Sequence, residues 1–186
     1  MINGALKIFA QNGYRHASTD EIVQEAAISK GLLFHYFYSK AGLYTFLTEY
    51  SARFSLVELS SELRRKEDIP FWDFQHALTR AESFIMRQYP YMLLFMDHAG
   101  FDKEADSYDL ARDHLLLYRD RRNALMEGAA AAAAMPLKEA MRLDGLIRLS
   151  RKEQASALLR DGSFTPDRYL SEVTETIRFI EKLYKK

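Results

Sequence analysis

Residues 18–40 have the sequence STDEIVQEAAISKGLLFHYFYSK, and this stretch decides the fold of the N-terminal part of the chain. Ser18 is a favoured helix N-cap and Glu21 follows three positions later, so the pair predicts a capping box. Ile22 and Ala26 are four residues apart and would share one face of the helix. The first half of the stretch therefore predicts a short, well-capped amphipathic helix.

A second short helix is predicted after a turn of about four residues. Ser29 is a suitable cap for it, and Leu33 and Phe37 again lie four residues apart, on one face. Two short helices joined by such a turn are typical of a helix-turn-helix, whose second helix enters the major groove of DNA. The stretch thus predicts a DNA-reading element.

The residues before this stretch predict one more amphipathic helix, which begins almost at Met1 with no leader before it and ends at Asn12-Gly13. Together, the three helices would form one small core from Leu6, Phe9, Tyr14, Ile22, Ala26, Leu33 and Phe37.

Helical periodicity continues to the end of the chain, and no strand alternation is present. A longer helix is expected from Ser39 to about Arg65, the next opens at Pro70 and stops before Pro90, and the last begins at Pro166. The fold class is therefore predicted to be all-α. Six consecutive alanines, Ala129 to Ala134, are either a true helical run or stand-ins for other residues.

Composition narrows the class of protein. The 186 residues include no cysteine, and Lys and Arg balance Asp and Glu, so a diffuse positive field is not expected to attract nucleic acid. No apolar run is long enough for a membrane span. No P-loop, G-x-S-x-G, dinucleotide glycine pattern or H-E-x-x-H is present. We therefore expect no enzyme activity, no cofactor, no metal and no membrane partner, and a cytoplasmic location.

Several short motifs occur together in the first 50 residues: Phe9-Ala10, Gly13-Tyr14, Asp20-Glu21-Ile22, Ile-Ser-Lys-Gly at 28–31, Phe-His-Tyr-Phe at 34–37, and Ser39-Lys40 followed by Leu43. In their order and spacing, they resemble the DNA-binding domain of the tetracycline-repressor-like (TetR family) transcriptional regulators. The resemblance implies a helix-turn-helix domain at residues 1–45 and a larger helical ligand-binding and dimerisation domain at residues 46–186.

The resemblance also implies which residues face DNA. Ser18 and Thr19 would present hydroxyl and backbone N–H groups to a phosphate, and Lys40 would hold a phosphate beyond the second helix. The remaining candidates lie on the second helix and would approach base edges or flanking phosphates; they are Lys30, Gly31, Leu32, His35 and Tyr36.

The chain departs from the family pattern at a few positions. Leu32 stands where Thr is common, Phe34 where Tyr is commonest, Ala27 replaces a turn glycine and Tyr38 a proline. The basic N-terminal extension of many relatives is also missing. Two interpretations stay open: a natural start upstream of Met1, or weak DNA binding.

Residues 70–120 carry more aromatic and Met side chains than one helix stripe needs, which favours an apolar ligand pocket between helices as well as a core. The candidate lining residues are Trp72, Phe84, Tyr91, Phe95, His98 and Tyr118. Asp97, Asp102, Glu104, Asp106, Asp109 and Asp113 with His98 and His114 could imitate a metal site, but a solvated acidic loop is favoured.

The last helix has an apolar seam that either packs internally or, as the resemblance favours, forms a dimer with the helix before it. The candidate interface residues are Leu158, Val173, Ile177 and Ile180. The expected protein is a homodimeric repressor that binds a double-stranded DNA operator and is released by a hydrophobic small molecule. The alternative is a helical small-molecule-binding protein with weak or lost DNA binding.

Overall fold

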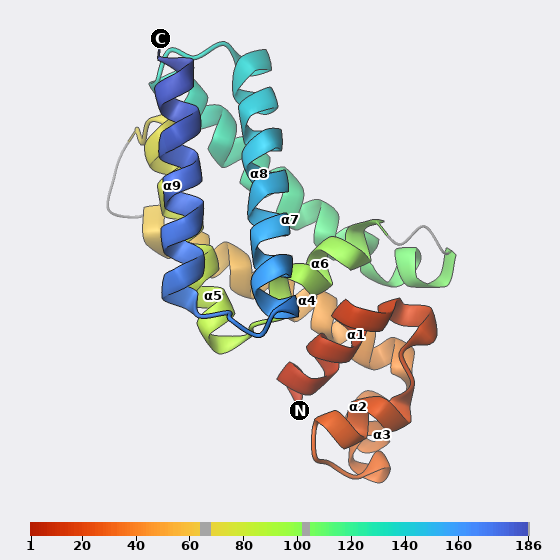
Figure 1. Cartoon of the computed structure of the whole chain (residues 1–186). Helices are drawn as coiled ribbons and strands as arrows, with labels where there is room; N and C mark the ends of the chain where they lie inside the picture. The colour runs from red at the N-terminus through yellow and green to blue at the C-terminus, as the bar shows by residue number, and fades with distance from the viewer. Residues whose placement is uncertain (64–67, 102–104, 186) are drawn as a thin grey trace. The chain divides into compact units, whose positions relative to one another are not determined.

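The computed structural model describes residues 1–63, 68–101 and 105–185, without the side chains of residues 101–108. Over these residues the chain forms nine helices and no strand (Figure 1), which confirms the all-α prediction. The helices are α1 (Ile2–His16), α2 (Thr19–Glu25), α3 (Lys30–Phe37), α4 (Lys40–Leu63), α5 (Phe71–Gln88), α6 (Met92–Phe101), α7 (Ala105–Ala132), α8 (Leu137–Arg160) and α9 (Pro166–Tyr184). None of the helices that are described is long and apolar enough to span a bilayer.

The predicted caps are present at the start of α2 and α3. The backbone N–H of Glu21 donates to Ser18 Oγ over 3.1 Å, and the Ser18 N–H donates to the Glu21 carboxylate over 2.9 Å, which completes the capping box. Ser29 Oγ accepts from the Leu32 N–H at the start of α3. Gly13 interrupts α1 with a φ of 70°, a backbone conformation that glycine adopts readily.

The helices pack into two compact units. Unit 1 comprises Met1–Ser55 and Gln88–Arg119, and unit 2 comprises Leu56–Arg87 and Asp120–Lys186. Helices α4, α5 and α7 each contribute residues to both units. The predicted boundary between residues 45 and 46 separates proposed roles rather than packing units, and it stays a prediction.

Unit 1 is built around α1, which packs against α2 and α6 (Figure 1). The Phe9 side chain is almost fully buried, with its ring centroid 5.0 Å from that of Tyr44 on α4 and 6.1 Å from that of Phe95 on α6. Leu6, Ile22 and Leu33, three of the predicted core residues, have no exposed surface. Four of the seven predicted core residues are thus buried, in a core that extends onto α4 and α6, while Tyr14, Ala26 and Phe37 are half-buried.

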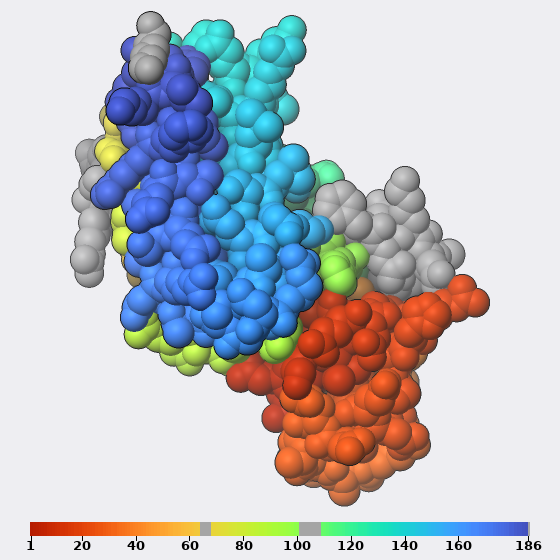
Figure 2. All heavy atoms as spheres, in the orientation of Figure 1, coloured from red at the N-terminus to blue at the C-terminus, as the bar shows by residue number. Residues whose placement is uncertain are grey.

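Unit 2 contains α8 and α9 packed side by side, and Figure 2 shows their side chains forming one adjoining surface. Beneath this surface lies an apolar core contributed by α5, α7, α8 and α9. Its fully or nearly fully buried members include Phe71, Phe74, Leu78, Ile85, Met126, Ile147, Leu158, Tyr169, Val173 and Ile177.

A buried ion pair crosses the core of unit 2. The Arg122 guanidinium on α7 donates twice to the Asp144 carboxylate on α8, over 2.9 and 2.6 Å, and Gln75 on α5 donates to the same carboxylate. Asp144 is 6% exposed and Arg122 7%. Burial by itself would raise the pKa of Asp144, but the hydrogen bonds and positive charge of Arg122, with smaller help from Gln75 and Arg151, keep that pKa below its ordinary value.

A second buried cation continues this network. Arg151 on α8, 3% exposed, donates to the Gln75 carbonyl oxygen over 2.6 Å and to Thr79 Oγ1, and its Nε lies 3.3 Å from a carboxylate oxygen of Glu82. The Tyr169 hydroxyl on α9 donates to that Glu82 carboxylate over 2.7 Å. Two arginines and two acids therefore link α5, α7, α8 and α9 with no net charge.

We expect Asp144→Ala to lower the free energy of unfolding by about 3–5 kcal/mol, because it leaves the Arg122 guanidinium buried without its carboxylate. The measurement is urea denaturation followed by far-UV circular dichroism. Glu153→Ala, which removes an exposed partner of Arg160, is the matched control and should cost less than about 1 kcal/mol. Equal losses of unfolding free energy for the two variants would contradict the stabilising role of the buried pair of Arg122 and Asp144.

The same carboxylate predicts a dependence on pH. Because its folded-state pKa is depressed, its contribution to stability is fully present above the ordinary value of 3.8 and is lost as the pH falls through the lowered pKa. In Asp144→Ala this part of the acid destabilisation should disappear.

Candidate DNA-binding surface

The helix-turn-helix is formed by α2, the turn 26–29 and α3. Ala27 in the turn has a positive φ of 52°, and Tyr38 after α3 has a φ of 61°. Both positions are departures noted in the sequence, and both place a side chain in a backbone region that L-residues adopt at a cost. The turn that glycine commonly makes in relatives is therefore formed here by alanine, with some strain.

Helix α3 buries one face and exposes the other. Leu33 has no exposed surface, whereas Leu32 is 41% and Tyr36 62% exposed. Lys30, Gly31 and His35 are exposed as well. The structure therefore brings together, on the outward face of one helix, the five residues predicted to approach the bases and flanking phosphates.

Ser18 and Thr19 occupy the start of α2, Ser18 exposed and Thr19 half-buried. The Ser18 N–H already donates to the Glu21 carboxylate, and this backbone hydrogen bond keeps the pKa of Glu21 below its ordinary value. A negative side chain therefore stands where the sequence predicted N–H groups for a phosphate. The remaining group of Ser18 that can reach DNA is its hydroxyl, so the predicted role narrows to that group.

Lys30 is held by an acidic neighbour. Its ammonium lies 2.8 Å from the Asp20 carboxylate on α2, and both side chains are largely open to solvent, at 50% and 75% of their surface. This ion pair spans the turn of the helix-turn-helix. The sequence placed Lys30 on the DNA-facing side but did not predict its partner.

Lys40 has an internal role that the sequence did not predict. Its ammonium donates to the carbonyl oxygens of Tyr14 and Ala17 over 2.8 and 3.0 Å and lies 3.5 Å from that of Arg15, all near the end of α1. The nitrogen is also 4.5 Å from the centroid of the Tyr14 ring. A phosphate contact by Lys40 would require these carbonyl contacts to be given up, which weakens its assignment as a phosphate clamp.

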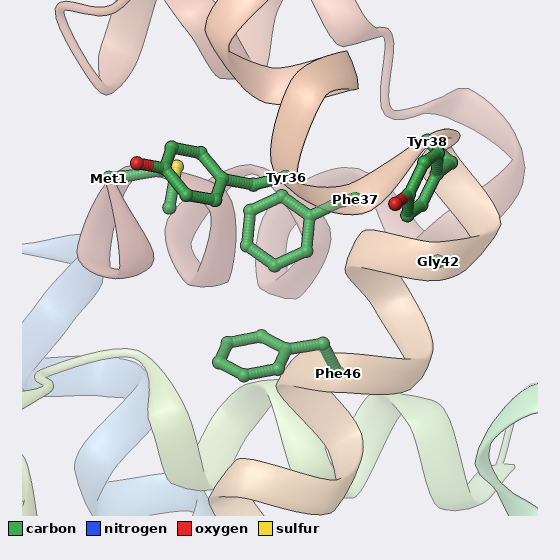
Figure 3. A pocket seen from close by; sticks show the side chains of 6 residues that line it. All are labelled: Met1, Tyr36, Phe37, Tyr38, Gly42 and Phe46. Atoms are coloured by element: carbon green, nitrogen blue, oxygen red, sulfur yellow. The ribbon is translucent and has the colours of Figure 1, made fainter.

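The junction of α3 and α4 is closely packed. A Cβ atom on Gly42 would lie 2.2 Å from the Phe37 carbonyl oxygen, so only glycine fits there. Beside this contact is an open apolar pocket, lined by Met1, Tyr36, Phe37, Tyr38, Gly42 and Phe46 (Figure 3). In Figure 3 the Tyr36 ring lies next to Met1, while the Phe37 ring points between Tyr36 and Phe46. Tyr36 therefore lines an open apolar pocket between the end of α3 and the start of α4.

The predicted ligand-lining residues do not all have the positions expected. Phe95 belongs to the core of unit 1, where its ring packs against Phe9 and Tyr44, and His98 is exposed. Trp72 packs against Phe71 and Tyr184 in unit 2, and Phe84 is 44% exposed. Tyr91 and Tyr118, both half-buried, belong to unit 1. The set is thus divided between the two units, and a shared pocket stays a prediction.

The acidic set is only partly described, because Asp102 and Glu104 lie outside the described residues and the side chain of Asp106 is not described. Among the described residues, no cluster of three or more His, Cys, Asp or Glu side chains is placed to bind a metal ion.

The predicted dimer residues are mostly interior. Leu158, Val173 and Ile177 are exposed by 2%, 1% and 0%, since they face the core of unit 2, and Ile180 is half-buried. The alternative that the seam packs internally therefore holds for these three residues, and a side chain without exposed surface cannot contact a second copy. The large exposed apolar side chains of α8 and α9 are instead Leu137, Met141, Leu146, Leu149, Phe179, Leu183 and Tyr184.

We expect Lys40→Met to lower the free energy of unfolding by about 2 kcal/mol in the absence of DNA, because the carbonyl oxygens at the end of α1 lose a charged donor. Lys30→Met, which removes an exposed lysine from the neighbouring helix, should change it by less than about 1 kcal/mol. Thermal unfolding without DNA measures both, and equal stability of the two variants would refute the internal role of Lys40.

Comparison of sequences supports this geometry. Residues 1–45 match the profile of the family described as "Bacterial regulatory proteins, tetR family". An uncharacterized HTH-type transcriptional regulator of Bacillus subtilis, YuxN, is 35% identical over 79 residues, which are 42% of this chain and 27% of that protein. The matched segment therefore spans about a quarter of the length of this curated relative.

Solved structures share the fold over almost the whole chain. A Clostridium perfringens protein assigned as a fatty acid metabolism regulator superposes with a TM-score of 0.66 at 19% identity, covering 95% of each chain. The regulator FadR of Bacillus subtilis, in complex with stearoyl-CoA, gives 0.64 at 11% identity, also over 95% of each. A TetR-like transcriptional regulator of Rhodococcus sp. RHA1 gives 0.58 at 16%, over 100% of this chain and 94% of the other. Residues 1–45 therefore match the N-terminal domain of the tetR family of bacterial regulatory proteins, and the chain as a whole shares its fold with solved TetR-like regulators.

Proposed function

We propose that this protein is a DNA-binding repressor that acts as a homodimer in the cytoplasm and leaves its operator when a hydrophobic small molecule binds. The observation that carries the proposal is the outward face of α3, where Leu32, His35 and Tyr36 are exposed opposite a fully buried Leu33. This is the arrangement by which a recognition helix presents side chains to a major groove.

The side chains of this face indicate what kind of readout to expect. Leu32 can contact the methyl group of thymine, and His35 can donate to or accept from base edges or phosphates. The His35 and Tyr36 rings lie edge to face, with centroids 5.2 Å apart, so each restricts the rotamers of the other. Two such helices about 34 Å apart in a dimer would read a nearly palindromic operator.

An aromatic row connects the end of α3 to the rest of unit 1, and this supports a regulatory role for α4. The Phe37 ring lies 5.2 Å from Phe46, which stacks on Tyr50 at 5.9 Å. The Tyr50 and Tyr89 hydroxyls are 2.6 Å apart, and burial together with this hydrogen bond raises the pKa of Tyr50 to about 12. A displacement of α4 would therefore be transmitted to α3 through packed rings.

Two features favour a hydrophobic effector: the aromatic and Met content of the helices, and the molecule bound to one of the structurally similar regulators. The chain shares its fold with a regulator solved with stearoyl-CoA, so a long-chain acyl-CoA is the first class of effector to test. Such a molecule can release the operator only to the extent that it binds the DNA-free conformation more tightly than the DNA-bound one.

The proposed dimer uses α8 and α9, but through other residues than the sequence predicted. Leu149 is 62% exposed and Phe179 63%, and both lie on helices that pack side by side in unit 2 (Figure 2). Met141 and Leu149 are two turns apart on α8, and Phe179 and Leu183 are one turn apart on α9. Exposed apolar surface of this kind is typical of a protein interface.

The second candidate function is a helical small-molecule-binding protein that binds DNA weakly or not at all. Two observations favour it: the Lys40 ammonium is engaged by the end of α1, and Phe34, 38% exposed, lacks the hydroxyl that a tyrosine would offer to a phosphate. DNA binding itself therefore separates the two candidates.

The test is a gel shift with the DNA upstream of the protein's own gene. We expect a specific complex in the presence of competitor DNA, and its loss when stearoyl-CoA is added. Coenzyme A without the acyl chain is the control and should leave the complex intact. A protein that binds stearoyl-CoA but forms no specific complex would support the second candidate.

For the dimer, we expect Phe179→Glu to raise the dissociation constant at least about 30-fold, because a charge would be buried in the centre of the interface. Analytical ultracentrifugation measures it, with circular dichroism to confirm that the variant folds. Leu117→Glu changes an apolar residue of α7 that is 51% exposed, and it should remain a dimer. A Phe179→Glu protein that dimerises like the unchanged protein would exclude this face.

A further inference from the structure

The ion pair between Asp20 and Lys30 joins the two helices of the helix-turn-helix. Asp20 belongs to the first turn of α2, and Lys30 is the first residue of α3. Their charged atoms are 2.8 Å apart, and the two side chains keep 75% and 50% of their surface in solvent. The pair is therefore a surface contact that can exchange partners, unlike the buried pair of Arg122 and Asp144.

Lys30 is important for phosphate binding although it is exposed, because the predicted DNA-contacting set contains few positively charged side chains. The predicted DNA-contacting set contains two lysines, and the ammonium of Lys40 is already surrounded by carbonyl oxygens of Tyr14, Arg15 and Ala17. The chain as a whole has no net charge. Within the predicted set, the Lys30 ammonium is thus the main positive charge that could contact a phosphate.

For Lys30 to bind a phosphate, its ammonium must leave the Asp20 carboxylate or share itself between two anions. Asp20 then remains beside the DNA backbone as an unpaired negative charge and holds a salt cation there. Each lysine that neutralises a phosphate normally releases a condensed counterion, which makes the affinity fall as salt rises. The cation retained at Asp20 offsets that release.

We propose that Asp20 is a positioning residue that sets the affinity for DNA and its salt dependence by holding the Lys30 ammonium. The proposal rests on the proposed function, since it concerns the operator complex. Asp20 keeps the side chain of Lys30 on the face of α3 while limiting its attraction for any DNA, so that sequence contacts by Leu32, His35 and Tyr36 decide where the protein binds.

The experiment compares Asp20→Asn with the unchanged protein on the operator fragment and on an unrelated fragment. We expect Asp20→Asn to bind the operator more tightly at low salt, by about fivefold per protomer, which is the upper end for an exposed ion pair. The slope of the logarithm of affinity against the logarithm of salt concentration should steepen by about one per protomer. Binding to the unrelated fragment should tighten at least as much.

Glu25→Gln is the matched control. It removes the same charge from the same helix, but Glu25 pairs with Lys7 on α1, 2.8 Å away, and not with a residue of the predicted DNA-facing set. We expect it to change the affinity by less than about twofold. If both variants bind DNA more tightly and steepen the salt dependence to the same extent, the loss of any one negative charge explains the effect, and the proposal is overturned.

Lys30→Gln and the double variant Asp20→Asn/Lys30→Gln test whether Asp20 acts through Lys30. If it does, removing the Asp20 charge has no further effect once Lys30 is gone. A gain that persists in the Lys30→Gln background would show direct repulsion of phosphates and overturn the proposal. If neither the unchanged protein nor any variant binds DNA, the proposed function fails as well, which is distinguishable from a failure confined to Asp20.

Discussion

The contact between the Lys40 ammonium and the carbonyl oxygens at the end of α1 fixes the geometry of the helix-turn-helix. The last carbonyl groups of a helix lack intrahelical partners, and here Tyr14 and Ala17 give theirs to a lysine that opens α4. Because α3 is joined to α4 by only two residues, the position of α4 also determines the position of α3. At that junction the Phe37 carbonyl leaves no room for a Cβ atom at position 42, so the junction requires Gly42.

A consequence of this arrangement is that lysines of the first three helices and the start of α4 already have partners within the protein. They would have to leave or share these partners to bind DNA. Lys7 pairs with Glu25, and that hydrogen bond raises the pKa of Lys7; Lys30 pairs with Asp20 and Lys40 caps α1. A chain without net charge cannot attract DNA through its overall field. Any specific binding of DNA must therefore depend on how well the protein surface fits the DNA and on the few side chains that α3 exposes.

Local features of the fold were predictable because they depend on neighbouring residues. The capping box of Ser18 and Glu21 and the cap at Ser29 follow from interactions within four residues, and both are present. The helix end predicted at Gly13 is a break inside α1, which continues to His16. The exposure of the outward side of α3 followed in the same way from the burial of Leu33 on its opposite side.

The partners of charged residues were not predictable, because they lie far apart in the chain. Lys40 contacts a carbonyl group 26 residues earlier, and Gln75 donates to a carboxylate 69 residues later. A sequence signal for the buried network did exist: on α8, Asp144 and Arg151 alternate with Ala140, Ile147 and Ala155 at helical spacing. Charged residues in such a stripe indicate a buried pair, but the stripe does not tell which helix supplies the partner.

Helix α9 shows why an apolar seam is ambiguous. Val173 and Ile177 form the four-residue spacing expected of an interface, yet that spacing is also what a helix needs to pack on its own core, and here they do so. Phe179 and Leu183 repeat the same spacing on another face of the helix and remain exposed. In this chain, α9 buries only one of its two apolar faces against the core of unit 2. The exposed face, rather than the more regular seam, is therefore the one available to the proposed dimer.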